Sequence, residues 1–126
     1  MQRLLVVVLS LLFLAGCEGK APQSELPIFD DPQLSLGMNT WMQVCRNCHL
    51  TGVAGAPAIH DANAWQARMK SGREKLYKSA LNGIATDSGW SMPPKGGMQQ
   101  LSDQQVKLAV DYMLAAQQQL ITEQRP

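Results

Sequence analysis

The stretch Cys45-Arg46-Asn47-Cys48-His49 decides how this chain is interpreted. Cys48 follows Cys45 by three positions and His49 follows it by four, so the three side chains project from one side of a helical turn. Two thiols and an imidazole at this spacing are typical of covalent haem c attachment, in which each thiol adds to one vinyl group and the histidine binds the iron. Because the pattern occurs once, the sequence predicts one haem.

Two other interpretations of the Cys45–Cys48 pair lack the residues that they need. A structural zinc site has four ligands, and only Cys17 and His60 remain among the three cysteines and two histidines of the chain. A thioredoxin-like redox pair belongs at the end of a strand in a βαβ unit, and no strong strand pattern lies nearby. Haem attachment is therefore the favoured interpretation.

The first 16 residues have the features of an export signal. Arg3 supplies positive charge, and the apolar run over residues 4–14 is too short to span a membrane comfortably. The run ends in Leu14-Ala15-Gly16-Cys17, which resembles the bacterial lipoprotein box, where the signal is removed before an acylated cysteine. We predict lipidation of Cys17; an ordinary signal peptide with a leftover thiol is the alternative.

The export signal agrees with the haem prediction, because haem c is attached outside the bacterial cytoplasm. In that compartment an uncaptured Cys45–Cys48 pair would tend to oxidise to a disulfide. We expect the mature protein on the periplasmic side of a membrane, held by two or more acyl chains on Cys17. Glu18 after the cysteine does not select between the inner and the outer membrane.

Length and charge limit the chain to one small domain. Its 126 residues carry 11 basic and 10 acidic side chains, and loss of Arg3 with the signal leaves ten of each, which argues against nucleic-acid binding. A domain of this size has a thin core. We therefore expect the haem to contribute packing as well as function, in a protein that is a monomer.

Helical periodicity and capping signals predict an all-α domain over residues 31–120, preceded by a flexible tether over 17–30 and followed by a tail over 121–126. Asp31-Pro32 starts a helix that ends at the haem motif. Capping boxes at Ser71–Glu74 and Ser102–Gln105 open two later helices, and a short helix is expected over 63–69. The Gly- and Pro-rich residues 51–59 and 84–101 are expected to be loops.

The second axial position of the iron has several candidate ligands. Met38, Met69 and Met113 lie in helical patterns that favour core packing. Met42 is too close to the attachment motif to reach the other face of a haem. These four methionines are therefore not the preferred ligands.

Met92 is the preferred second ligand. It lies in a loop far along the chain, and Pro93-Pro94 stiffens the backbone that follows it. His/Met ligation is a common haem c arrangement. Met98 is the runner-up, and His60 would give a bis-histidine haem.

With the haem motif and Ser91-Met92-Pro93-Pro94-Lys95-Gly96-Gly97 both identified, residues 31–116 resemble class I cytochromes c, and are most similar to the bacterial cytochrome c5 group. The other shared features are Gly52-Val53-Ala54-Gly55-Ala56-Pro57, Ala64-Trp65 with Arg68, Ala80-Leu81-Asn82-Gly83, and Ser102-Asp103 leading into Ala109-Val110-Asp111-Tyr112-Met113.

This resemblance implies a small all-α class I cytochrome c fold around one haem, with His49 and Met92 as axial ligands. It implies that Gly37 and Trp41 pack against Tyr112, and that the Pro57 carbonyl accepts a hydrogen bond from His49. It makes Trp65 and Arg68 candidate partners of the haem propionates, and Pro93 part of the haem pocket. Members of the group often carry a cysteine pair after the Gly-Gly; here Met98 and Leu101 stand in those places, and residues 84–89 form a longer segment than usual.

From these features we predict a membrane-tethered electron carrier that does no substrate chemistry and exchanges electrons with redox proteins. A basic stretch could steer an acidic partner, and Lys95 is a second docking candidate. The alternatives are a haem subunit of a larger membrane oxidoreductase and a haem enzyme or sensor with a labile sixth ligand. The basic stretch consists of Arg68, Lys70, Arg73, Lys75 and Lys78.

Overall fold

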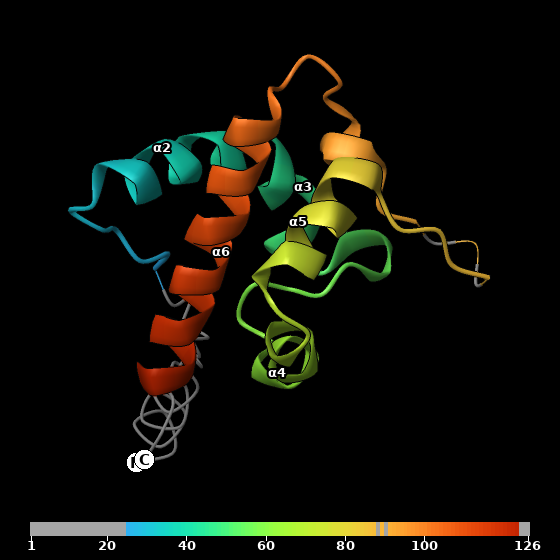
Figure 1. Cartoon of the computed structure of the whole chain (residues 1–126). Helices are drawn as coiled ribbons and strands as arrows, with labels where there is room; N and C mark the ends of the chain where they lie inside the picture. The colour runs from blue at the N-terminus through green and yellow to red at the C-terminus, as the bar shows by residue number, and fades with distance from the viewer. Residues whose placement is uncertain (1–24, 88, 90, 124–126) are drawn as a thin grey trace, which may run out of the picture.

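Helix α6, Asp103–Glu123, is the longest element of the computed structural model, and the other helices pack around it (Figure 1). The structure describes residues 25–87, 89 and 91–123. Within these ranges the regular structure is helical apart from one isolated bridge, in agreement with the predicted all-α class. The predicted signal peptide and Cys17 lie outside the described residues.

The first helix starts and ends where the sequence predicts. α2, Pro32–Thr40, continues through the π-helical turn η1, Trp41–Cys45, into α3, Arg46–His49. The Asp31 carboxylate caps α2 by accepting hydrogen bonds from the backbone N–H groups of Gln33 (2.8 Å) and Leu34 (2.9 Å). The π-helical turn ends at Cys45, the first residue of the haem motif, and such turns are frequent at functional sites.

A close approach of α2 to α6 forms the centre of the core. A Cβ atom on Gly37 would overlap the Leu108 carbonyl and lie 3.1 Å from the Tyr112 Cβ, so glycine allows the two backbones to meet. The Trp41 and Tyr112 rings lie 5.8 Å apart, and both side chains are fully buried. The predicted packing of Gly37 and Trp41 against Tyr112 is confirmed.

The segment before α2 is packed against the domain, which corrects the predicted tether. Leu26 and Phe29 pack against the core cluster, and the Phe29 ring meets Tyr112 edge-on at 6.1 Å. The Tyr112 hydroxyl donates to the Pro27 carbonyl at 3.2 Å. These apolar side chains gain from burial, so a tether over residues 17–30 would have to end before Leu26.

Two short helices follow the attachment motif: α4, Ala62–Lys70, and α5, Arg73–Asn82. The predicted capping box at Ser71 is wrong. Ser71 ends α4 in a helical conformation (φ −74°, ψ −8°), and its hydroxyl donates to the Arg68 carbonyl at 2.7 Å. Only Ser71 and Gly72 separate the helices, so Ser71 lacks the extended backbone of an N-cap, and Gly72 precedes α5 without a side-chain cap.

The second predicted capping box is present at the start of α6. The Gln105 N–H donates to the Ser102 hydroxyl at 3.1 Å, and the Ser102 N–H donates to the Gln105 side chain at 2.9 Å. The helix runs to Glu123, three residues beyond the predicted end of the domain.

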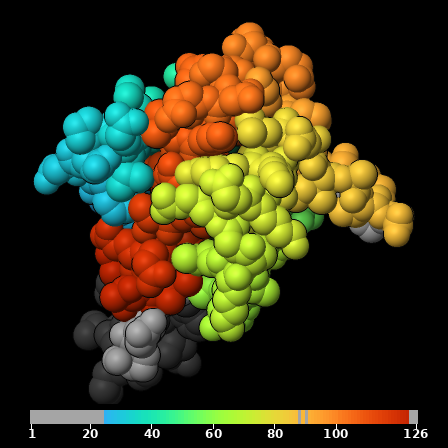
Figure 2. Space-filling view, viewed as in Figure 1, coloured from blue at the N-terminus to red at the C-terminus, as the bar shows by residue number. Residues whose placement is uncertain are grey.

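The segment between α5 and α6 has more order than its glycines and prolines suggest. Ile84 and Met92 form an antiparallel bridge, and Pro94–Gly97 forms the 3₁₀ turn η3. Part of this segment, coloured yellow to orange, projects from the body of the molecule (Figure 2). The shorter loop after α3 holds a second 3₁₀ turn, η2, at Val53–Gly55. Among the described residues, no helix has both the length and the apolar character needed to cross a membrane.

Candidate functional site

A cavity of about 330 Å³ brings the predicted site residues together. Its walls come from the first helix, the loop before α4, helices α4, α5 and α6, and the segment around Met92. The predicted residues that line it are Cys45, Cys48, His49, Pro57, Trp65, Arg68, Met92 and Pro93.

The two alternative iron ligands are not among the residues that line this cavity. His60 is exposed. Met98 is half-buried, and its sulfur accepts a hydrogen bond from the Gln100 amide at 2.8 Å. Two of the methionines considered as iron ligands line the cavity, Met92 and Met113. Met113 is buried in the helical core, as its position in a helical pattern predicts.

His49 is held by its ring and by its backbone. Its Nδ1 lies 2.9 Å from the Pro57 carbonyl, and its own carbonyl accepts a hydrogen bond from the Ile59 N–H at 2.6 Å. A carbonyl can only accept, so Nδ1 carries the proton and Nε2 keeps its lone pair. Burial lowers the pKa of His49, which keeps the ring neutral at pH 7. The predicted bond to Pro57 is confirmed, and it leaves a nitrogen able to bind a metal.

Trp65 lies beside His49 in the cavity wall, with the centres of the two rings 6.2 Å apart. Its indole N–H donates to the Ala58 carbonyl at 2.8 Å. The donor that a propionate would need is therefore already used, and Trp65 acts in the structure as a support for the loop that carries Pro57. Arg68 lines the cavity, is exposed, and donates to the Ala64 carbonyl one turn earlier.

The two motif cysteines are free thiols rather than a disulfide. Burial is the main cause that raises the pKa of Cys45 to about 11, so this thiol is protonated at neutral pH. Within the described ranges, no three His, Cys, Asp or Glu side chains gather in a way that could hold a metal ion. The arrangement therefore gives no support to the zinc interpretation.

The Met92 segment is held by close backbone contacts on both sides of Met92. Its N–H and carbonyl each form a 2.9 Å hydrogen bond with the backbone of Ile84. Gly83 makes this pairing possible, since a Cβ atom there would lie 2.6 Å from the Met92 carbonyl and 2.9 Å from the Pro94 nitrogen. Gly96 lies against Val44 in the same way, with a hypothetical Cβ 2.5 Å from the valine methyl.

Lys95 is not the free docking residue that the sequence suggests. Its ammonium group donates to the Leu101 carbonyl at 2.7 Å and pairs with Asp103 at 2.8 Å. No sequence pattern pairs Lys95 with Asp103 or predicts the contact of Val44 with Gly96, because both contacts depend on how the chain folds back on itself.

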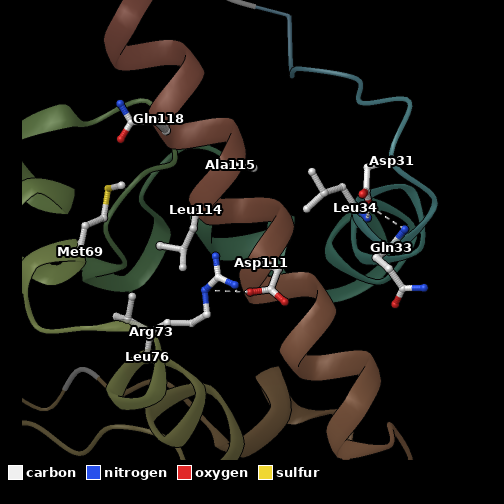
Figure 3. A pocket seen from close by; sticks show the side chains of 10 residues that line it. All are labelled: Asp31, Gln33, Leu34, Met69, Arg73, Leu76, Asp111, Leu114, Ala115 and Gln118. Carbon is white, nitrogen blue, oxygen red and sulfur yellow. Dashed lines mark hydrogen bonds and ion pairs between the residues drawn. The ribbon is translucent and has the colours of Figure 1, made fainter.

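A second hollow on the surface lacks the thiol and imidazole groups that line the cavity at the Cys45–His49 motif (Figure 3). It lies between α2, α5 and α6, and the Arg73–Asp111 ion pair crosses it at 3.4 Å. The residues that line it are Asp31, Gln33, Leu34, Met69, Arg73, Leu76, Asp111, Leu114, Ala115 and Gln118, with neither cysteine nor histidine among them. The cavity at the Cys45–His49 motif is therefore the candidate site.

The chemistry of the cavity fits a haem. It combines two thiols, a neutral imidazole and a thioether with largely apolar walls. Trp41 also lines it, and the buried Nε1 of this tryptophan has no hydrogen-bond partner among the residues that the structure describes. A buried donor without an acceptor is costly, and a bound group with acceptor atoms would satisfy it.

Comparisons with known proteins agree with this chemistry. Residues 32–113 match the family described as cytochrome C oxidase, cbb3-type, subunit III. Cytochrome c-555 of Chlorobaculum tepidum is 40% identical over 78 residues, which cover 62% of this chain and 71% of that protein. Cytochrome c5 of Azotobacter vinelandii is 37% identical over 71 residues, which cover 55% of this chain and 80% of that protein.

A solved structure shares the fold. It is a chain from a crystal structure of an electron transfer complex of nitrite reductase with cytochrome c, with a TM-score of 0.58 and 32% identity over 69% of this chain and 96% of that chain.

The chain belongs to the class I cytochromes c and is similar to cytochrome c5. It is a small electron-carrying cytochrome whose cofactor is haem c, and Cys45, Cys48 and His49 fit the attachment motif of that cofactor.

Proposed function

We propose that this cytochrome shuttles single electrons at the periplasmic face of a bacterial membrane, with His49 and Met92 as the two axial ligands of its iron. The observation that carries the ligand assignment is the lining of the cavity. Met92 and His49 both line it, whereas His60 and Met98 do not. Cys45 and Cys48 line the same cavity and are the proposed covalent anchors.

Each ligand has a distinct part in this proposal. When bound, haem c supplies an iron that cycles between the ferric and ferrous states. His49 presents a neutral Nε2, because its Nδ1 is held by Pro57. Met92 offers a thioether, which favours the ferrous state and raises the potential. With both axial positions filled, no position remains for a substrate, so the protein transfers electrons without bond chemistry.

The proposed partners are redox proteins that dock over the mouth of the cavity. Val53 and Ile84 line the cavity and are 53% and 44% exposed, so they offer an apolar contact near the cofactor. Exposed basic side chains of α4 and α5 would attract an acidic surface. They are Arg68, Lys70, Lys75 and Lys78. The nitrite reductase complex of a related cytochrome c is a precedent for such a partner.

Attachment to the membrane rests on the sequence Leu14-Ala15-Gly16-Cys17. Acyl chains on Cys17 and the residues up to Leu26 would leave the haem domain near the membrane surface. Mass spectrometry of the protein purified from membranes tests this step. A diacylated or triacylated Cys17 at the N-terminus supports it, and a soluble protein with an unmodified N-terminus rejects it.

The ligand assignment is tested by spectra of residues 18–126 exported with the haem-attachment machinery. We expect a low-spin haem with the near-infrared charge-transfer band of methionine-ligated ferric iron. Met92→Ala should abolish the band and open the iron to carbon monoxide. Met98→Ala is the matched control and should keep the band, because its sulfur is not part of the cavity lining.

Other outcomes select other functions. A parent protein whose ferrous haem binds carbon monoxide readily would favour the enzyme or sensor interpretation. Loss of the band in Met98→Ala but not in Met92→Ala would reject the assigned ligand.

A second candidate function is favoured by the description of the matching family, which names an oxidase subunit. In that case the protein would be a fixed haem subunit of a larger membrane oxidoreductase. Stable co-purification with such a complex after detergent extraction would support this candidate, and a free monomer would support the carrier.

A further inference from the structure

Lys95 has an unusual conformation for a residue with a side chain. Its φ angle is +54°, in the left-handed region that L residues other than glycine rarely adopt. Gly96 and Gly97 follow it with φ angles of +64° and +88°. A non-glycine residue kept in this region points to a side chain with a specific task.

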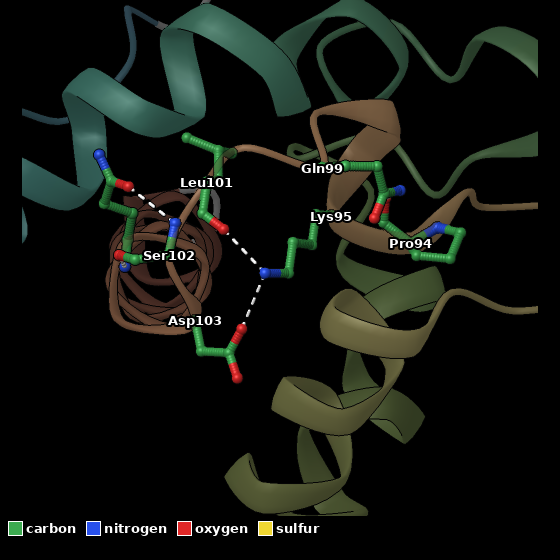
Figure 4. Close-up of polar contacts among 7 residues, drawn as sticks. Pro94, Lys95, Gln99, Leu101, Ser102 and Asp103 are labelled. Carbon is green, nitrogen blue, oxygen red and sulfur yellow. Dashed lines mark hydrogen bonds and ion pairs between the residues drawn. The ribbon is translucent and has the colours of Figure 1, made fainter.

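The Lys95 side chain folds back to the start of α6 (Figure 4). Its ammonium group donates to the Leu101 carbonyl at 2.7 Å and meets the Asp103 carboxylate at 2.8 Å. The lysine side chain is only 20% exposed, whereas that of Asp103 is 68% exposed. The hydrogen bond from Lys95 lowers the pKa of Asp103, which favours the charged carboxylate.

These contacts join the two ends of the segment from residue 95 to residue 103. No cysteine lies in this segment, so no covalent crosslink can do so. Met92 lies three residues before Lys95, and its other ties run to Ile84 after α5 and, through Gly96, to Val44 of the first helix. The hydrogen bond of Lys95 ties this turn to Leu101, just before α6, and its ion pair ties the turn to Asp103, the first residue of α6.

We infer that Lys95 is a positioning residue for Met92: its contacts with Leu101 and Asp103 hold the Met92 loop, residues 84–101, closed over the cavity. The inference rests on the proposed role of Met92 as an iron ligand. A thioether is a weak ligand, so its persistence on iron depends on how firmly the protein backbone holds it in place. Lys95 and Leu101 both line the cavity, which places this tie at the edge of the haem site.

The test is competition between Met92 and added imidazole in the ferric holoprotein. Lys95→Met keeps the aliphatic stem but removes the charge and the donors. We expect imidazole to displace the near-infrared band at a roughly tenfold lower concentration, the effect of losing one charge-assisted hydrogen bond. Lys95→Arg should restore most of the parent behaviour, since it keeps a cation with several donors. Lys75→Met removes an exposed lysine of α5 and should behave like the parent.

Asp103→Asn provides a second variant that leaves the Lys95 backbone untouched. We expect about a threefold shift in the same direction, because a neutral acceptor remains. Parent-like imidazole binding in both Lys95→Met and Asp103→Asn would overturn the inference while leaving Met92 as ligand. A parent protein without the near-infrared band would overturn the proposed ligand, and the inference with it.

Discussion

The attachment segment, residues 45–59, and the Met92 loop, residues 84–101, supply the predicted iron ligands in different ways. In the attachment segment, the partners of His49 are Pro57 and Ile59, both within ten positions of it. In the Met92 loop, Met92 pairs with Ile84 and Lys95 with Asp103 over similar spans, but Gly96 also packs against Val44 of the first helix, far back in the chain. Both sides of the cavity therefore use local contacts, and the Met92 side depends in addition on a contact between segments that are far apart in the chain.

This difference bears on stability. Local contacts need little loop closure, whereas contacts between distant residues have to offset a larger loss of chain entropy. Part of the Met92 loop also projects from the body of the molecule in Figure 2. We therefore expect the Met92 side of the cavity to open at a lower free-energy cost than the attachment side.

The largest effect should come from breaking the attachment segment itself. The double variant Cys45→Ser/Cys48→Ser removes both thiols and should lose all covalent haem, because no other described cysteine is present. A haem-stained denaturing gel measures this directly, and circular dichroism reports how much helix the apoprotein keeps. Cys17→Ser, which alters only the proposed lipid site, is the control and should retain covalent haem. A retained haem stain in the double variant would reject the attachment assignment.

The next effect should come from breaking the Met92 loop without touching Met92. Gly83→Ala would place a Cβ atom 2.6 Å from the Met92 carbonyl at a φ of +79°, and should lower the free energy of unfolding by about 3 kcal/mol. Gly72→Ala is the matched control. Its φ is also positive, at +92°, but no atom lies within 4 Å of the added Cβ, so about 1 kcal/mol is expected.

Denaturant unfolding followed by circular dichroism gives these two values, and the near-infrared band of the ferric protein reports on the ligand. The band should weaken in Gly83→Ala and stay unchanged in Gly72→Ala. Equal losses of stability in the two variants, with the band intact in both, would show that the close approach at Gly83 does not hold the loop.

The smallest effect on the haem should come from breaking the contact of Tyr77 with Asp111 between α5 and α6. These residues belong neither to the attachment segment nor to the Met92 loop. The Tyr77 hydroxyl donates to Asp111 at 2.6 Å, and Lys107 lies 5.6 Å from the centre of the tyrosine ring. Tyr77→Phe should lower the free energy of unfolding by about 1.5 kcal/mol at neutral pH. It should leave the near-infrared band unchanged, because Tyr77 is not part of the cavity lining.

The same variant has a pH signature. Burial and the bond to Asp111 raise the pKa of Tyr77 to about 12, above its unfolded value of about 10. Between these values the unfolded chain loses the proton first, so the stabilisation from Tyr77 is present below about pH 10 and is lost as the pH rises towards about 12. The stability difference between parent and Tyr77→Phe should shrink across this range in denaturant titrations; a constant difference would contradict the assignment.

Features that depend on neighbours in sequence were predicted well. The cap at Asp31 and the capping box at Ser102 both lie where local signals place them. The prediction of a capping box at Ser71 was wrong because α4 ends directly before this residue. Ser71 therefore caps the end of α4 and cannot also take the extended backbone conformation that would cap the start of α5. The tether prediction failed because Leu26 and Phe29 pack against the core cluster, where Phe29 meets Tyr112 of the distant α6, rather than within their own segment.

The sequence by itself determined the cofactor, the attachment motif and the all-α class, because thiol and imidazole spacing and helical periodicity are properties of short stretches of chain. The tertiary structure decided which candidates share one cavity, that Trp65 supports the His49 side rather than offering its N–H, and that Lys95 is bound to Asp103 instead of facing a partner. These outcomes depend on which distant groups meet once the helices pack, and the spacing of residues along the chain does not contain that information.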